Sequence, residues 1–144
     1  AGLMVATAES CTGGLIASAL TEVAGSSDVV ECGFVTYSNE AKQTLLGVPV
    51  GLFDKVGAVS EEVARAMAEG AMARSKAQLA VSVTGIAGPG GGTETKPVGL
   101  VHMAIAREGL ETLHFRDVFP GDRSEVRIAT VIAALQRLSV VATG

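Results

Sequence analysis

The stretch Val5-Ala6-Thr7-Ala8-Glu9-Ser10-Cys11-Thr12-Gly13-Gly14 decides how this chain folds. The apolar residues 3–8 predict a short buried strand, and after the two glycines an apolar repeat with helical spacing begins at Leu15. Ser10 is therefore expected where a strand turns into a helix. Its hydroxyl would lie near the free backbone N–H groups and the positive dipole end of that helix, which favour a bound anion or an oxyanion. The alternative is that Ser10 only caps the helix.

Strands and helices are expected to alternate along the rest of the chain. The predicted strands cover residues 29–37, 79–83, 98–106 and 110–119, the predicted helices cover residues 15–23, 39–46, 60–72 and 122–138, and residues 50–59 are expected to be a loop. Glu108-Gly109 predicts a hairpin between the last two strands. This order predicts an α/β fold, a three-layer α/β/α sandwich with a mixed, mostly parallel sheet. We expect residues 1–144 to form a single domain.

The composition argues against several classes of protein. A net charge of −4 and a pI of about 5.1 give no basic surface for nucleic acid. No apolar run approaches the roughly 20 residues that span a bilayer, so we expect no membrane association. The two cysteines lack C-x-x-C spacing, which favours free thiols in a reduced, cytoplasmic protein.

Polar and glycine-rich segments follow three of the predicted strands, and the ligand crevice of open α/β sheets lies beyond the carboxyl ends of the strands. Residues 84–93 contain many glycines but match neither the dinucleotide fingerprint nor the P-loop. Their backbone N–H groups could still form a concave site for a phosphate or a carboxylate. The alternative is a flexible surface loop.

A serine nucleophile needs a base, and lysine is the base most available to Ser10. His102 and His114 fall within the predicted hairpin strands, away from the crevice. Lys42 lies in the first turn of a helix that follows a strand, so it could lean over the same strand ends. Its pKa would have to fall by about 3 units for it to act near neutral pH. Tyr37 could then relay or donate a proton to the leaving group.

Other residues near the predicted crevice leave alternatives open. Glu9, the neighbour of Ser10 on an extended segment, should point to the opposite face and leave Lys42 unpaired. Cys11 is a rival nucleophile, because a helix N-terminus also lowers a thiol pKa, but without a nearby histidine we expect it to be packed and inert. Arg123 and Arg127, four residues apart on one helix face, could clamp a phosphate or simply solvate that face.

Several ordered motifs resemble one known family. They are Thr7-Ala8-Glu9-Ser10-Cys11-Thr12-Gly13-Gly14, Thr36-Tyr37-Ser38-Asn39-Glu40-Ala41-Lys42, Gly57-Ala58-Val59-Ser60-Glu61-Glu62-Val63-Ala64, Thr84-Gly85-Ile86-Ala87-Gly88-Pro89 and Lys96-Pro97-Val98-Gly99-Leu100-Val101. The chain resembles, nearly end to end, the C-terminal domain of the competence/damage-inducible CinA family of nicotinamide-nucleotide amidohydrolases. The resemblance implies hydrolysis of the carboxamide of nicotinamide mononucleotide to nicotinate mononucleotide and ammonia, in pyridine nucleotide recycling.

The same resemblance implies roles for individual residues. Ser10 would be the nucleophile, Lys42 its base and Tyr37 an assisting proton donor or acceptor. The residues that would line the substrate pocket are Thr84, Gly85, Gly88 and Gly91, and Arg123 or Arg127 would contact the phosphate. Apart from the resemblance, we expect the backbone N–H groups of the turn after Ser10 to hold the oxyanion and contact the substrate; the residues of this turn are Cys11, Thr12, Gly13 and Gly14. We expect no metal ion, no cofactor, and a homodimer as the oligomer.

Two alternatives to this function stay open from the sequence. The first is a catalytically silent module that binds a nucleotide or docks on a partner. The second keeps the amidase chemistry but acts on another small nucleotide that carries an amide.

Overall fold

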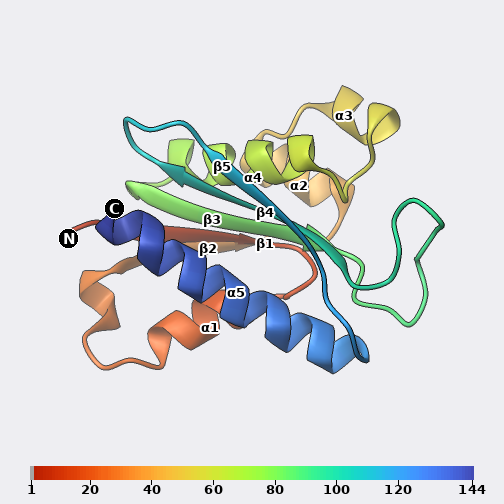
Figure 1. The fold of residues 1–144 in the computed structure, drawn as a ribbon. Helices are drawn as coiled ribbons and strands as arrows, with labels where there is room; N and C mark the ends of the chain where they lie inside the picture. Colours follow the sequence, from red (N-terminus) through yellow and green to blue (C-terminus); the bar gives the residue numbers. More distant parts are fainter. Residues whose placement is uncertain (1) are drawn as a thin grey trace.

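Five strands form one sheet in the order β2-β1-β3-β4-β5 in the computed structural model, which describes residues 2–144 (Figure 1). The strands are β1 (Val5–Glu9), β2 (Val30–Val35), β3 (Leu79–Gly85), β4 (Leu100–Arg107) and β5 (Leu113–Val118). β1 pairs in parallel with both β2 and β3, whereas β4 is antiparallel to β3 and to β5. Within the described residues only β4 therefore runs against the other strands, which confirms the mixed, mostly parallel sheet.

Helices cover both faces of this sheet and make the predicted three layers (Figure 1). On one face lie α1 (Leu15–Thr21) and the long α5 (Arg123–Thr143). On the other face lie α2 (Asn39–Leu46), α3 (Val50–Lys55) and α4 (Glu61–Ala73). A single 3₁₀ turn, η1 (Ser26–Asp28), leads from α1 into β2.

The helix α3 corrects the prediction that residues 50–59 form a loop. Pro49, with φ fixed near the helical value, precedes its first residue. Leu52 and Phe53 pack against the buried cluster between the sheet and α4. Six residues are too few for an apolar repeat to show in the sequence, so the periodicity argument could not detect this helix.

The core is built from small aliphatic side chains on both sides of the central strands. Val81 and Val83 of β3 face α1 and α5, whereas Ala80 faces α4. On the α4 side, Ala64 and Ala68 pack directly on Ala104 and Ala106 of β4. Strands covered on both faces are expected to be largely apolar, and β3 is apolar except for Ser82 and Thr84, whose hydroxyls donate to the carbonyls of Ala64 and Ala58.

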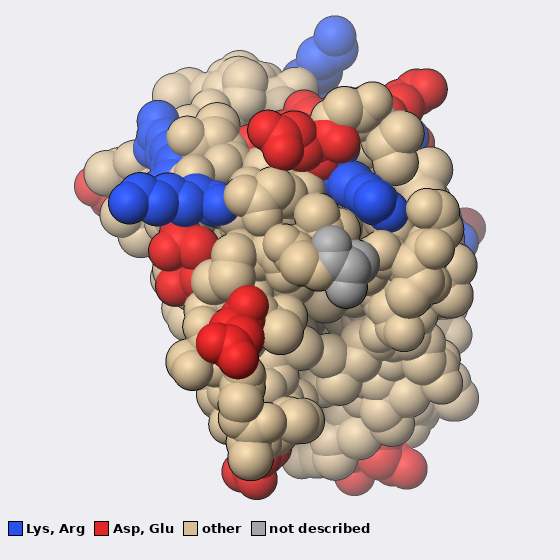
Figure 2. All heavy atoms as spheres, turned by 90° about the vertical axis from the view of Figure 1, so that its left-hand side faces the viewer, with Lys and Arg blue, Asp and Glu red and all other residues tan. Residues whose placement is uncertain are grey.

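The helix α5 is long enough and apolar enough, by length and composition, to cross a membrane. A core helix passes the same test, and α5 buries Val126, Thr130, Ala134 and Leu138. Its Arg137 forms an ion pair with Asp117 of β5. We therefore interpret α5 as a packed helix of this fold. On the face drawn in Figure 2, basic and acidic side chains are interspersed in the upper part, and the lower part is largely uncharged.

Candidate active site

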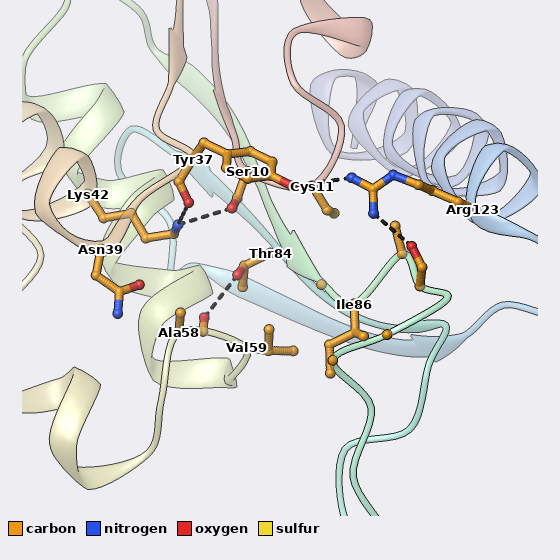
Figure 3. Close-up of a pocket in the computed structure, with 15 residues that line it drawn as sticks. Ser10, Cys11, Tyr37, Asn39, Lys42, Ala58, Val59, Thr84, Ile86 and Arg123 are labelled. Atoms are coloured by element: carbon orange, nitrogen blue, oxygen red, sulfur yellow. Dashed lines mark hydrogen bonds between the residues drawn. The ribbon is translucent and has the colours of Figure 1, made fainter.

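A pocket of about 290 Å³ lies where the chain leaves the carboxyl ends of β1, β2 and β3. This is the edge of the sheet at which the sequence predicts a ligand crevice. Figure 3 shows side chains from the β1–α1 turn, the β2–α2 loop, the linker before α4, the glycine-rich loop and α5 pointing into it. The predicted site residues among those that line it are Ser10, Cys11, Tyr37, Lys42, Thr84, Gly85, Gly88, Gly91 and Arg123.

Ser10 and Lys42 are in direct contact on the side of this pocket away from Arg123 (Figure 3). The Lys42 Nζ donates to Ser10 Oγ at 3.0 Å and to the backbone carbonyls of Thr36 (2.9 Å) and Tyr37 (3.0 Å). The Lys42 residue is only 1% exposed, and this burial lowers the pKa of its ammonium from 10.5 to about 8. The amine is therefore held beside the alcohol with a pKa low enough that about one Lys42 in ten is neutral at pH 7. This is the arrangement that a serine nucleophile with a lysine base requires.

The local sequence explains how the two side chains meet. Ser38 caps α2 by accepting a hydrogen bond from the Ala41 N–H, which places Lys42 in the first turn and above the end of β1. The backbone N–H of Ser10 donates to the Val83 carbonyl at 3.1 Å, so Ser10 is fixed to the end of β3. Backbone hydrogen bonds thus fix the positions from which both the Lys42 and the Ser10 side chains extend.

Glu9 occupies the start of α1, which corrects one prediction about Ser10. The buried Glu9 carboxylate accepts hydrogen bonds from Thr12 Oγ1 (2.7 Å) and from the backbone N–H groups of Ile16 (2.8 Å) and Ala17 (2.9 Å). The helix begins only at Leu15, so Ser10 neither caps it nor faces its free donors. Glu9 does point away from Lys42, as the alternation of side chains along a strand predicts.

Arg127 braces the turn after Ser10 and does not line the pocket. Its guanidinium donates to the carbonyls of Cys11 (3.1 Å) and Thr12 (3.2 Å). In a trans peptide the carbonyl and the N–H of the next residue point in opposite directions. Because the Cys11 carbonyl points toward Arg127, the Thr12 N–H in the same trans peptide points away from Arg127. Within residues 2–144 the N–H groups of Cys11 and Thr12 donate to no protein oxygen.

Three more residues predicted to contact substrate lie off the pocket lining. Thr12 is fully buried and its hydroxyl is bonded to Glu9. Gly13 and Gly14 have positive φ angles and form the tight bend into α1. Together with Arg127, these residues shape the turn, and a direct contact with a ligand stays a prediction for them.

Cys11 lines the pocket but is unsuited to act as the nucleophile. Burial raises the pKa of its thiol to about 11, so almost no thiolate is present near neutral pH. This agrees with the predicted packed, inert cysteine.

The glycine-rich loop is anchored at several points, which argues against a merely flexible segment. Thr84 Oγ1 donates to the Ala58 carbonyl at 2.9 Å, and Arg123 donates to the Gly88 carbonyl at 2.7 Å. Gly88 has a φ of 87°, and a Cβ there would meet Val98 at 2.5 Å, so only glycine fits. In the described chain the N–H groups of Ala87 and Gly91 have no protein acceptor, which leaves them for a ligand.

The Tyr37 hydroxyl bonds to Arg123 and not to Ser10. Arg123 Nη2 donates to Tyr37 Oη at 3.2 Å, and the Tyr37 residue is 62% exposed. A proton-transfer role for Tyr37 therefore stays a prediction. Arg123 lines the pocket whereas Arg127 does not, so the two arginines predicted to share a face do different things.

The two histidines lie outside the pocket, as predicted. His102 on β4 and His114 on β5 contact each other, with Nδ1 and Nε2 at 2.8 Å. Burial lowers the pKa of His102 to about 4. Neither histidine lines the pocket.

Three pocket residues were not singled out from the sequence: Asn39, Ala58 and Val59. Ile86, Ala87 and Gly90 also line the pocket and belong to the predicted concave segment 84–93, although they were not named individually. Asn39 opens α2 and lies inside a polar segment at a strand end, a signal that could have singled it out. Ala58 and Val59 come from the linker before α4 and carry no polar group that would mark them.

The sequence model of the CinA C-terminal domain family matches residues 1–141. The chain belongs to the CinA C-terminal domain family. It is 55% identical, over 139 residues, to a Pseudomonas putida protein named nicotinamide-nucleotide amidohydrolase PncC, covering 96% of this chain and 86% of that protein. It is also 55% identical to a putative competence-damage inducible protein of Caldicellulosiruptor bescii, covering 94% of this chain and 33% of that protein. The chain thus spans about a third of the length of several curated relatives.

Solved structures of this family have the same fold. The crystal structure of competence/damage inducible protein CihA from Agrobacterium tumefaciens is 56% identical, with a TM-score of 0.96 over 98% of this chain and 86% of that one. The competence damage-inducible protein A from Klebsiella pneumoniae is 39% identical, with a TM-score of 0.92 over 96% of this chain and 85% of that one. These matches confirm the predicted α/β architecture and the family resemblance.

Proposed function

We propose that this chain hydrolyses the carboxamide of nicotinamide mononucleotide, giving nicotinate mononucleotide and ammonia. The name of the Pseudomonas putida relative supports an amidohydrolase of nicotinamide nucleotides. The observation that carries the proposal to this chain is the 3.0 Å contact between Lys42 Nζ and Ser10 Oγ in a pocket. A buried amine with a lowered pKa next to an alcohol is suited to acyl transfer.

In the first half of the reaction, neutral Lys42 takes the proton of Ser10 as the Ser10 oxygen attacks the carboxamide carbon. The backbone N–H groups of Cys11 and Thr12 donate to no protein oxygen within residues 2–144 and follow the nucleophile directly, so they can hold the oxyanion. Arg127 binds the Cys11 carbonyl, which lies between these two N–H groups in the chain, and so keeps it turned away from that position. The tetrahedral intermediate collapses as the nitrogen leaves as ammonia, with the proton that Lys42 received, and an ester forms on Ser10.

In the second half, a water molecule replaces ammonia. Lys42, neutral again, takes a proton from the water as its oxygen attacks the ester carbon. The second intermediate collapses to the carboxylic acid product, the proton on Lys42 returns to the Ser10 oxygen, and the released acid loses its own proton to solvent. The protein ends in its starting state, and one amide and one water have become one acid and ammonia.

The nucleotide phosphate would lie at the other end of the pocket. Arg123 brings a guanidinium to the lining, and the glycine-rich loop brings free backbone N–H groups. A site with a nucleophile at one end and anion donors at the other fits a small amide-bearing nucleotide.

Ammonia release from nicotinamide mononucleotide tests this proposal. Ser10→Ala and Lys42→Met should both lose turnover, whereas Ser27→Ala and Lys55→Met, at exposed positions away from the pocket, should keep it. Unchanged turnover in Ser10→Ala would remove the serine from the mechanism. Turnover of a different amide-bearing nucleotide, without any of the mononucleotide, would correct the substrate.

Many relatives are named only as CinA-like or competence-damage inducible proteins, which keeps a silent binding module as the second candidate. Calorimetric binding of the mononucleotide without any product would favour it. We further propose a cytoplasmic location, in keeping with the free thiols of Cys11 and Cys32, and a homodimer, which sedimentation analysis would test.

A further inference from the structure

One hydrogen bond joins two walls of the pocket across its mouth. Arg123, the first residue of α5, donates from Nη2 to the hydroxyl of Tyr37, which lies in the loop between β2 and α2, at 3.2 Å (Figure 3). The same guanidinium donates from Nη1 to the Gly88 carbonyl at 2.7 Å. Arg123 therefore ties the glycine-rich loop and Tyr37 to the start of α5.

The two bonds of Arg123 differ in how easily a ligand can replace them. The Tyr37 side chain is mostly exposed and, in the described chain, makes no other hydrogen bond. Its phenol oxygen is a neutral acceptor, whereas a phosphate is charged and binds a guanidinium roughly twice as strongly. An anion that reaches Arg123 would displace the phenol, while the Gly88 carbonyl keeps the guanidinium in place.

Tyr37 would be released beside the reacting groups. Its backbone carbonyl accepts from Lys42 Nζ at 3.0 Å, and the same Nζ contacts Ser10 Oγ. The ring therefore pivots from a point next to this pair. Freed from Arg123, its hydroxyl can hydrogen-bond to a group that reacts at Ser10.

We infer that Arg123 and Tyr37 form a latch that the phosphate of the ligand opens, and that this latch selects phosphorylated nucleotides over their ribosides. The identity of the nucleotide rests on the proposed function, but the latch itself does not. Phosphate binding then serves the reaction as well as affinity, because binding energy from a remote group is used to arrange the reacting centre. Selectivity should accordingly appear in kcat and not only in KM.

The composition of the chain offers a direct probe of the latch. Tyr37 is the only tyrosine and there is no tryptophan, so intrinsic emission reports on this one side chain. Titration with inorganic phosphate should change the tyrosine emission saturably in the unmodified chain. The change should vanish in Arg123→Gln and persist in Arg116→Gln, which removes one exposed positive charge outside the pocket lining.

Two results of this titration would overturn the latch. One is an unmodified chain whose emission does not respond to phosphate even at high millimolar concentration. The other is a response of equal size and midpoint in Arg123→Gln, which would place the anion elsewhere.

Kinetics separate the latch from the proposed function. Nicotinamide riboside should show a kcat about tenfold below that of the mononucleotide, the scale of one charge-assisted hydrogen bond. Added phosphite dianion should restore much of that kcat in the unmodified chain and none of it in Tyr37→Phe. Equal kcat for both substrates overturns the latch while the amidase stands. If neither substrate is hydrolysed, the amidase fails and the emission titration still decides the latch.

Discussion

In the mechanism proposed above, Lys42 must be neutral to take the proton of Ser10. Turnover of nicotinamide mononucleotide should therefore rise with pH and level off near pH 8. With a pKa of about 8, about one Lys42 in ten is neutral at pH 7. At the ordinary value of 10.5, only about one in three thousand would be. Burial of the side chain thus supplies about 300-fold more active base, equivalent to about 3.4 kcal/mol at 1.36 kcal/mol per pKa unit.

The assay is the initial rate of nicotinate mononucleotide formation, measured by chromatography from about pH 6 to about pH 9.5. Direct detection of product avoids a coupling enzyme that has a pH dependence of its own. We expect kcat/KM to rise about tenfold per pH unit below pH 7 and to reach a plateau above pH 8. Lys42→Met should lose the ascending limb together with about 10²- to 10⁴-fold of the rate.

Two profiles would refute this reasoning. A rate that still climbs tenfold per unit at pH 9.5 would mean that the lysine has its ordinary pKa and that its burial has no catalytic effect. A flat profile across the range, with Lys42→Met nearly as active, would mean that another group is the base.

The same pKa shift should appear in stability. The pKa of Lys42 is lower in the folded than in the unfolded chain, so the unfolded chain binds more protons between about pH 8 and pH 10.5. Stability should therefore rise with pH through that window, by up to about 3 kcal/mol for this one group. Urea unfolding of the unmodified chain and of Lys42→Met measures it, and curves that stay parallel across the window would contradict the shift.

Three substitutions test the residues around Lys42. Ser10→Ala should abolish product formation while the thermal midpoint hardly changes, since only one hydroxyl is lost; retained activity would exclude Ser10. Arg127→Lys should lower kcat about tenfold with little change in KM, because a lysine cannot hold both the Cys11 and the Thr12 carbonyls; an effect on KM alone would make Arg127 a binding residue. Glu9→Gln should lower the free energy of unfolding by about 1.5–3 kcal/mol, since an amide cannot accept all three bonds at the start of α1. Denaturant unfolding measures this, with exposed Glu22→Gln as the unchanged control.

The architecture and the central pair could be predicted because each leaves a local signal. β3 is mostly apolar because both of its faces are buried. The apolar residues of α4 recur with helical spacing because only one face of that helix is buried. Ser10 and Lys42 could be paired in advance because both follow strand ends, and parallel strands bring such ends together.

The details that sequence did not yield depend on contacts between distant segments. Nothing local distinguishes Arg123 from Arg127, yet one lines the pocket and the other braces the turn after Ser10. The sequence indicates only that Glu9 belongs to a strand. The structure shows that its carboxylate accepts hydrogen bonds from the backbone N–H groups of Ile16 and Ala17 in α1, seven and eight positions later in the chain. Ala58 and Val59 belong to a linker that Thr84 and Lys96, both distant in the sequence, hold through hydrogen bonds to the carbonyls of Ala58 and Val56.

Gly2 lies beside the first residues of β1 and β3 and beside Ala142 near the end of α5, at the ends of these strands opposite the pocket that contains Ser10 (Figure 1). A polypeptide joined at either end would leave the molecule on the side away from Ser10. A further module attached there would leave the pocket beside Ser10 uncovered. Such an arrangement is compatible with the relatives that are about three times as long as this chain.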